Sequence, residues 1–126
     1  MKYSIYKNVS ISMNKSKTYS HVISSDHLDE AKLAIQNIEP EAEIYIFGSR
    51  ATGTATDDSD WDLLILLPGK VDWNRKEKII ESLVEVEIKY KEVFGIVVIE
   101  LDKWNYEKLF HETPFYNNVN QEKIAI

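Results

Sequence analysis

The apolar run WDLLILL at 61–67 constrains the fold more than any other segment of the chain. Beyond Asp62 every residue of this run is apolar, so an extended strand here has two apolar faces. Strands of that kind lie in the middle of a sheet that is covered on both sides. Pro68 and Gly69 end the run. The sequence therefore predicts a central, doubly covered strand at 61–67.

Helices and further strands are predicted around this run. A helix is capped by Ser24, Ser25 or Asp26, extends to Ile38 and ends before Pro40. The other expected elements are a strand at Glu43–Phe47, a helix from Asn74 to Tyr90, a strand at Ile96–Leu101 after a break at Gly95, a helix at Lys103–His111 and a final helix opened by Pro114. The end of the 74–90 segment also alternates like a strand, but its length and its Glu and Lys content favour a helix. This order predicts a single α/β or α+β domain.

The first twenty residues differ from the rest, being polar and rich in Lys, Ser and Tyr. Two short runs, at 3–5 and 9–13, alternate between apolar and polar residues and are typical of a hairpin, although no glycine marks the turn. A mobile or partner-bound tail fits the same segment. The expected organisation is an N-terminal extension or hairpin at 1–22 and one domain at 23–126.

Composition limits the classes of function. The chain has no cysteine, which excludes disulfides and cysteine-ligated metal sites. A net charge of −6 argues against broad nucleic-acid binding, which requires a basic surface. It does not argue against a nucleotide, because a metal ion can bridge acidic side chains and phosphates. The longest apolar runs are too short to span a bilayer and no signal-peptide pattern opens the chain, so we expect a cytoplasmic protein without membrane contact.

The segment before the central strand lacks a P-loop. Gly48 and Gly53 have the required spacing, but Thr54 and Ala55 stand where the motif needs Lys followed by Ser or Thr. Without the lysine that reaches the phosphates, this interpretation fails.

The same segment is not an EF-hand calcium loop. Asp58, Asp60 and Asp62 imitate the start of such a loop, but Leu63 stands where a glycine must turn the chain. Gly69 stands where the bidentate glutamate belongs, so this interpretation fails as well.

A site for nucleotidyl transfer fits the residues better. Asp60 and Asp62 are two residues apart, so on a strand both carboxylates point to one face, about 7 Å apart at the backbone. Such a pair can share divalent ions, and Trp61 between them then faces the core. Gly48 and Ser49 follow the preceding strand and offer a tight turn, backbone N–H groups and a hydroxyl, which suit a phosphate.

These segments also carry a family resemblance. FGSRATG at 47–53, followed by DSDWDLL at 58–64, resembles the signature of the DNA polymerase β nucleotidyltransferase superfamily, and more narrowly of the minimal nucleotidyltransferases of prokaryotes. The segment at 114–122 is similar, more loosely, to the tail of bacterial members. The resemblance implies the nucleotidyltransferase fold, in which a small mixed β-sheet packs against helices.

The resemblance also implies roles for individual residues. Gly48 and Ser49 would hold a nucleoside triphosphate, with Arg50 as a further candidate, and Asp60 and Asp62 would bind Mg²⁺ in a two-metal site. The implied reaction is in-line attack of an acceptor on the α-phosphate, with AMP from ATP as the expected transferred group and pyrophosphate as the product. Small members of this type can pair with a helical partner protein and modify it, some as antitoxins. A second copy of the chain is the other expected partner.

The chain departs from the family pattern at the third carboxylate. The usual position of this carboxylate falls near Val97 or Val98, which are apolar. Glu100 is the only acid in that strand and is a candidate catalytic residue, but an exposed strand end explains it as well. A non-catalytic module that acts through protein contacts therefore stays open as a second hypothesis.

Other polar and aromatic residues have simpler interpretations. Asp57 and Asp58 are expected to be loop residues, and Arg50 is either a phosphate ligand or a surface arginine. The histidines show no metal-ligand spacing and are expected at the surface: His21, His27 and His111. The tryptophans are expected to pack rather than to stack on bases: Trp61, Trp73 and Trp104.

Overall fold

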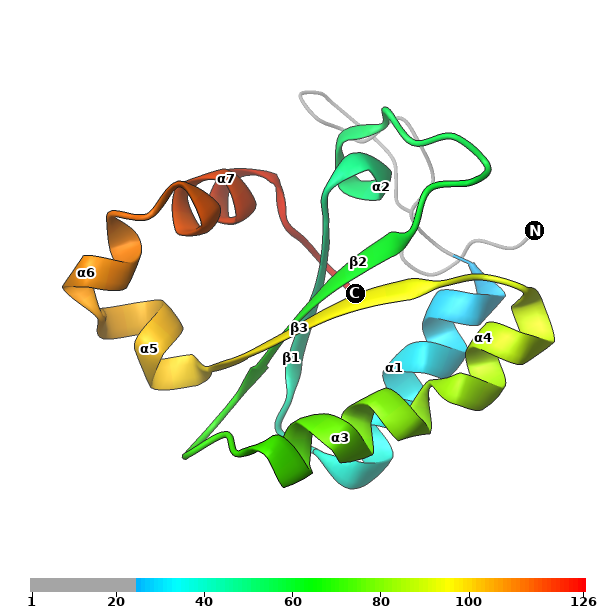
Figure 1. Ribbon diagram of the computed structural model, residues 1–126, viewed down its shortest axis with the longest axis horizontal. Coiled ribbons are helices and arrows are strands. Elements are labelled where there is room, and N and C mark those ends of the chain that lie inside the picture. The colour runs from blue at the N-terminus through cyan, green and yellow to red at the C-terminus, as the bar shows by residue number, and fades with distance from the viewer. Residues whose placement is uncertain (1–24) are drawn as a thin grey trace.

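A four-stranded mixed sheet is the centre of the computed structural model, which describes residues 25–126 (Figure 1). The expected extension at 1–22 and the domain boundary after it lie outside the described residues. The sheet order is β3-β2-β1-β4. The strands are β1 (Glu43–Phe47), β2 (Trp61–Leu67), β3 (Phe94–Glu100) and β4 (Ile124–Ala125). Strand β1 runs antiparallel to β2 and β4, whereas β2 and β3 are parallel.

Strand β2 is central and covered on both faces, as its sequence predicts. All residues from Leu63 to Leu67 are at most 1% exposed. The helices that cover the sheet are α1 (Asp26–Ile38), α3 (Trp73–Ser82), α4 (Val84–Tyr90), α5 (Leu101–Tyr106), α6 (Lys108–His111) and α7 (Pro114–Glu122). Figure 1 shows α1, α3 and α4 on one side of the sheet and α5 to α7 on the other.

The alternation of β2 side chains divides the core into two clusters. Leu63, Ile65 and Leu67 pack against the side of α1, α3 and α4. Leu64 and Leu66 pack against the side of α5 and α7. Because strand residues alternate between faces, Asp62 belongs to the face of α5 to α7 and Trp61 to the opposite face.

Local capping signals account for the helix boundaries that the sequence predicts. The predicted bounds of α1 are confirmed, and Ser25 caps this helix by accepting a hydrogen bond from the Leu28 N–H. Thr113 caps α7, and Pro114 occupies its first turn as predicted. Such caps satisfy backbone N–H groups that have no partner within the helix.

The structure departs from the sequence-based assignment at several boundaries. The 74–90 segment is helical as expected but is divided at Leu83 into α3 and α4. The predicted helix at 103–111 begins earlier and is divided at Glu107 into α5 and α6. The prediction that Gly95 breaks the chain before the third strand is wrong, because Gly95 is paired inside β3. The one-turn helix α2 (Ser49–Thr52) and strand β4 were not predicted. Within residues 25–126, no helix has the length and apolarity needed to cross a membrane.

Candidate functional site

The turn after β1 meets the start of β2. The antiparallel register places Phe47 opposite Asp62, so the next residue, Gly48, lies beside the aspartate. Gly48 has φ 75° and ψ −157°, a conformation that side chains disfavour. A Cβ at this position would also collide with the Asp62 carboxylate. The predicted phosphate side and the predicted metal side of the site are thus in direct contact.

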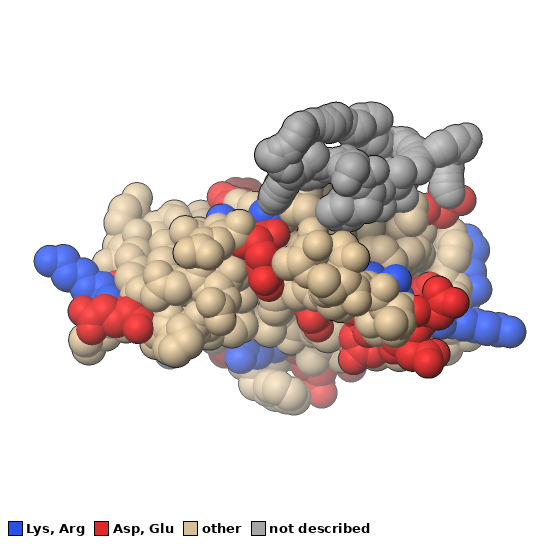
Figure 2. Space-filling view, turned by 90° about the horizontal axis from the view of Figure 1, so that it is seen from above, with Lys and Arg blue, Asp and Glu red and all other residues tan. Residues whose placement is uncertain are grey.

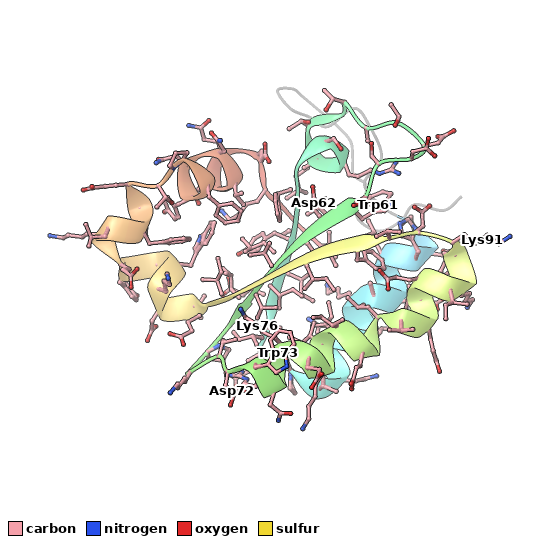
Figure 3. All side chains as sticks on the ribbon, viewed as in Figure 1. Trp61, Asp62, Asp72, Trp73, Lys76 and Lys91 are labelled. Carbon is pink, nitrogen blue, oxygen red and sulfur yellow. The ribbon has the colours of Figure 1, made fainter. Side chains whose placement is uncertain are left out.

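Asp62 is held in an environment that disfavours its charge. Burial raises the pKa of its carboxyl group, and the charges of Asp60 and Glu122 raise it further. On its other side lies Gly95 of β3, where an added Cβ would stand 2.8 Å from the Asp62 Oδ1. A bound cation at this carboxylate would offset both the burial and the repulsion. Figure 3 shows Asp62 at the end of β2 that lies nearest α2.

Asp60 approaches the same site from outside the strand. The strand begins one residue later, where the Trp61 N–H donates to the Val93 carbonyl (2.8 Å), so Asp60 is not a strand residue as the spacing argument assumed. Its side chain is exposed, and its charge acts on Asp62. The two aspartates therefore lie close enough to interact electrostatically.

Trp61 faces away from this carboxylate, as predicted, and packs against the α1 side of the core. The Arg50 guanidinium lies over its ring at 4.4 Å, and Arg50 Nη2 donates to the Ser59 carbonyl at 2.8 Å. Arg50 thus ties α2 to Trp61 and to the loop before β2. This half-buried arrangement differs from the free surface residue considered for Arg50, and its role as a phosphate ligand stays a prediction.

A carboxylate that the sequence did not single out completes the surroundings of Gly48. The Gly48 N–H donates to Glu122 Oε2 at 2.8 Å. Glu122 is the last residue of α7, 74 positions along the chain. The only sequence signal for it is the loose similarity of 114–122 to the tail of bacterial minimal nucleotidyltransferases.

A family model matches most of the chain. The model described as "Nucleotidyltransferase domain" matches residues 28–124, which include strands β1 to β3 and both aspartates. The chain belongs to the nucleotidyltransferase domain family. The resemblance to DNA polymerase β-like nucleotidyltransferases is thereby confirmed.

Individual relatives are more distant. The terminal uridylyltransferase cid1 of Schizosaccharomyces pombe is 33% identical over 69 residues, which cover 55% of this chain and only 16% of that protein. A solved toxin-antitoxin structure with AMP-PNP is 14% identical with a TM-score of 0.54, over 80% of this chain and 72% of that one. A protein of Sulfolobus solfataricus described as a nucleotidyltransferase is 20% identical with a TM-score of 0.47, over 79% and 80% of the two chains. The mixed sheet with helices is the nucleotidyltransferase fold.

In this nucleotidyltransferase domain, Glu100 lies far from the two aspartates. It pairs with Leu67 at the opposite end of β2, five residues from Asp62, or about 17 Å along the strand. Its Oε2 accepts a hydrogen bond from the Val71 N–H at 3.0 Å. Val97 is paired with Leu64 and packs into the cluster on the Asp62 face. Strand β3 thus brings no carboxylate to Asp62.

The donor set suits Mg²⁺ better than a metal that needs a complete protein cage. Among residues 25–126, no three His, Cys, Asp or Glu side chains are arranged to hold a metal ion. Mg²⁺ in nucleotide-binding sites commonly takes one or two carboxylates and completes its shell with waters and substrate phosphates. Asp60 and Asp62 meet that requirement. Figure 2 views this end of the sheet from above and shows acidic side chains at the surface, with no large basic patch on the described part of this face.

The remaining expectations have mixed outcomes. Asp57 and Asp58 are exposed turn residues, as predicted. The surface assignment of His27 is wrong, because it is 8% exposed and its ring lies 4.6 Å from that of Trp61. His21 lies outside the described residues. Packing is confirmed for Trp104, which is 4% exposed, but not for Trp73, which is 66% exposed.

Proposed function

We propose that this protein is a Mg²⁺-dependent nucleotidyltransferase that moves AMP from ATP to an acceptor. One observation carries the proposal: Asp62, with Asp60 beside it, lies against the Gly48–Ser49 turn in a chain of the nucleotidyltransferase domain family. Two interacting carboxylates next to a turn with a free hydroxyl serve no packing purpose. Among residues 25–126, no side chain or backbone group hydrogen-bonds to Ser49 Oγ, which leaves it available for a phosphate oxygen.

In the proposed reaction, an acceptor oxygen forms a bond to the α-phosphorus as the bond to the β-phosphate breaks. Pyrophosphate leaves, and the proton of the acceptor passes to solvent. Asp60 and Asp62 would hold Mg²⁺, which neutralises charge on the transferring group and orients the phosphates. Ser49 would hold a phosphate oxygen, and Gly48 allows the chain to approach the Asp62 carboxylate closely. Catalysis then comes mainly from positioning.

The choice of AMP and of a protein acceptor has separate support. The toxin-antitoxin structure that shares the fold contains AMP-PNP, an ATP analogue. It is also an assembly of two proteins, and we propose a partner protein as the acceptor of this chain. The curated relative is a uridylyltransferase, so UTP is the competing donor to test.

A transfer assay tests the proposal. The purified protein is incubated with Mg²⁺ and each α-labelled nucleoside triphosphate, alone and with proteins that co-purify with it. We expect label from ATP on an acceptor protein, and transfer at background level for Asp60→Asn and Asp62→Asn. Asp58→Asn is the matched control, because Asp58 is an exposed aspartate of the same loop and is expected to retain transfer.

A second candidate is a non-catalytic module that binds nucleotide or protein partners. The observation that favours it is the apolar Val97 on the Asp62 face, together with the remote position of Glu100. Nucleotide binding in the absence of transfer to any acceptor would support the module. Transfer that depends on both aspartates would reject it.

A further inference from the structure

The C-terminal segment reaches the site through the edge of the sheet. Strand β4 pairs antiparallel with β1, with Ile124 opposite Ile46. Extension of this register by two residues places Glu122 opposite Gly48. The backbone ladder has ended there, and the Glu122 side chain accepts the Gly48 N–H instead, at 2.8 Å.

The backbone that carries Glu122 is anchored on both sides. Before it, Val119 is 3% exposed and packs in the cluster that contains Leu64 and Leu66. After it, the Lys123 N–H donates to the Val119 carbonyl at 2.8 Å, and the β4 ladder follows. The carboxylate is therefore presented from a fixed position rather than from a loose chain end.

Gly48, which donates this hydrogen bond to the Glu122 carboxylate, is the residue whose position sets the geometry of the site. Gly48 stands directly against the Asp62 carboxylate and precedes Ser49. A displacement of Gly48 would change the distance between Ser49 and Asp62.

We propose that Glu122 is a positioning residue that fixes Gly48, and through it the spacing between the Ser49 hydroxyl and the Asp62 carboxylate. Its importance for nucleotide binding depends on the proposed function, whereas the hydrogen bond itself does not. The last turn of α7 and strand β4 are then part of the site. The Gly48 N–H donates its hydrogen bond to Glu122 and therefore does not donate to a phosphate.

Hydrogen exchange of the Gly48 amide in the nucleotide-free protein tests the hydrogen bond. Glu122→Ala removes the acceptor, and we expect Gly48 exchange to accelerate by about tenfold or more, the factor that corresponds to 1.4 kcal/mol. Glu122→Gln keeps an acceptor oxygen without the charge, and we expect it to restore most of the protection. Gln121→Ala, at the adjacent exposed position, is the matched control and is expected to leave Gly48 exchange unchanged.

Affinity for AMP-PNP with Mg²⁺, measured by calorimetry on the same variants, tests the consequence. We expect Glu122→Ala to weaken binding by about tenfold and Glu122→Gln to recover most of the loss, while the amides of β1 and β2 stay protected in both. Unchanged Gly48 exchange in Glu122→Ala, or an equal loss in Glu122→Gln, would overturn the positioning role. Tighter binding by Glu122→Ala would overturn it too, since Glu122 would then occupy the place of a phosphate. A wild-type protein that binds no nucleotide rejects the proposed function, and the exchange result still decides the role of Glu122.

Discussion

The Asp62 carboxylate lies against the backbone of Gly95 on the neighbouring parallel strand. The two residues are paired in the β2–β3 register, and a methyl group on Gly95 would stand 2.8 Å from Asp62 Oδ1. A glycine inside a strand weakens it and commonly marks a close approach. Here the approaching group is the side chain on which the proposed chemistry depends.

Replacement of this glycine is expected to impair function more than stability. In Gly95→Ala the carboxylate must rotate away, which the flexible Asp62 side chain can do at small cost. We expect nucleotide transfer to fall by about 100-fold, as for a displaced reacting group. The free energy of unfolding should stay within about 1 kcal/mol of wild type, because alanine also restricts the unfolded chain. Steady-state kinetics and denaturant unfolding measure the two effects.

Gly69→Ala is the control variant, in which we expect stability to fall and nucleotide transfer to be retained. Gly69 has φ 79°, but an added Cβ would meet only Arg75 Nη1, at 3.8 Å. We therefore expect backbone strain and a loss of stability, with transfer retained at a temperature where the variant is folded. Full activity in Gly95→Ala would show that the observed Asp62 orientation is not required.

Removal of the charge of Asp62 is expected to stabilise the protein at neutral pH. The pKa of this carboxyl is raised in the folded state, so folding favours its protonated form. Below the ordinary value of about 4 the group is neutral in both states. Stability is lost as the pH rises through the folded-state pKa, and at pH 7 the ionised carboxylate is destabilising. Asp62→Asn should thus raise the unfolding free energy at pH 7 by a few tenths of a kcal/mol, about the size of other partly exposed charge effects.

The pH dependence separates this effect from a general gain in packing. Thermal unfolding of Asp62→Asn and wild type should differ at pH 7 and converge as the pH falls toward about 4. A difference that is the same at both pH values would contradict the electrostatic explanation.

Elements with local signals were predictable from the sequence. The apolar run of β2 identified the central strand. The cap candidates at 24–26 and Pro40 bounded α1, because caps and prolines act within a few residues. The Gly48–Ser49 turn and Asp62 could be linked because both flank adjacent strands. Each of these inferences depends on interactions that are close in sequence.

What the sequence could not reveal depends on distant contacts. Gly95 was interpreted as a break in the chain. The reason for a glycine at this position is the Asp62 carboxylate, which lies 33 positions earlier in the sequence. His27 has a polar side chain, yet the rings of Trp61 and Phe94 pack against it and bury it. Glu122 acquires its role only when β4 pairs with β1, and a two-residue strand has no detectable pattern of its own.

The Arg75 guanidinium joins α3 to two other parts of the fold, and its replacement by lysine is expected to be destabilising. Its Nε and Nη2 donate to the two oxygens of Glu39 at 3.0 and 2.8 Å. Its Nη1 donates to the carbonyls of Pro68 and Lys70 at 3.0 and 2.7 Å. Lysine cannot reproduce this planar fork. We expect Arg75→Lys to lose about 1–3 kcal/mol of unfolding free energy in denaturant titrations.

The ion pair of Lys103 provides the matched control for the Arg75–Glu39 ion pair. Lys103 lies 3.8 Å from Glu107, and both side chains are about half exposed. Exposed pairs of this kind contribute little, so Lys103→Ala should leave the denaturation midpoint nearly unchanged. Equal losses in the two variants would mean that the geometry of Arg75 adds nothing beyond its charge.

His27 is expected to make the protein sensitive to mild acid. Burial lowers the pKa of its imidazole, and Arg50 lowers it further, against the opposing charges of Glu92, Asp26 and Asp29. At pH 7 the ring is neutral in the folded state and largely neutral in the unfolded chain. As the pH falls below the ordinary value of about 6.5, the unfolded chain takes up a proton that the folded state resists, and stability is lost at about 1.4 kcal/mol for each unit of pKa depression.

His27→Phe isolates this contribution while it keeps a ring beside Trp61 and Phe94. Unfolding midpoints measured from pH 7 to pH 5 should fall more steeply for wild type than for the variant. The comparison cancels the carboxyl groups common to both proteins, which begin to titrate at the lower end of this range. Parallel curves would show that the buried imidazole takes up its proton as readily in the folded protein as in the unfolded chain, and that its enclosure by Trp61 and Phe94 imposes no electrostatic cost.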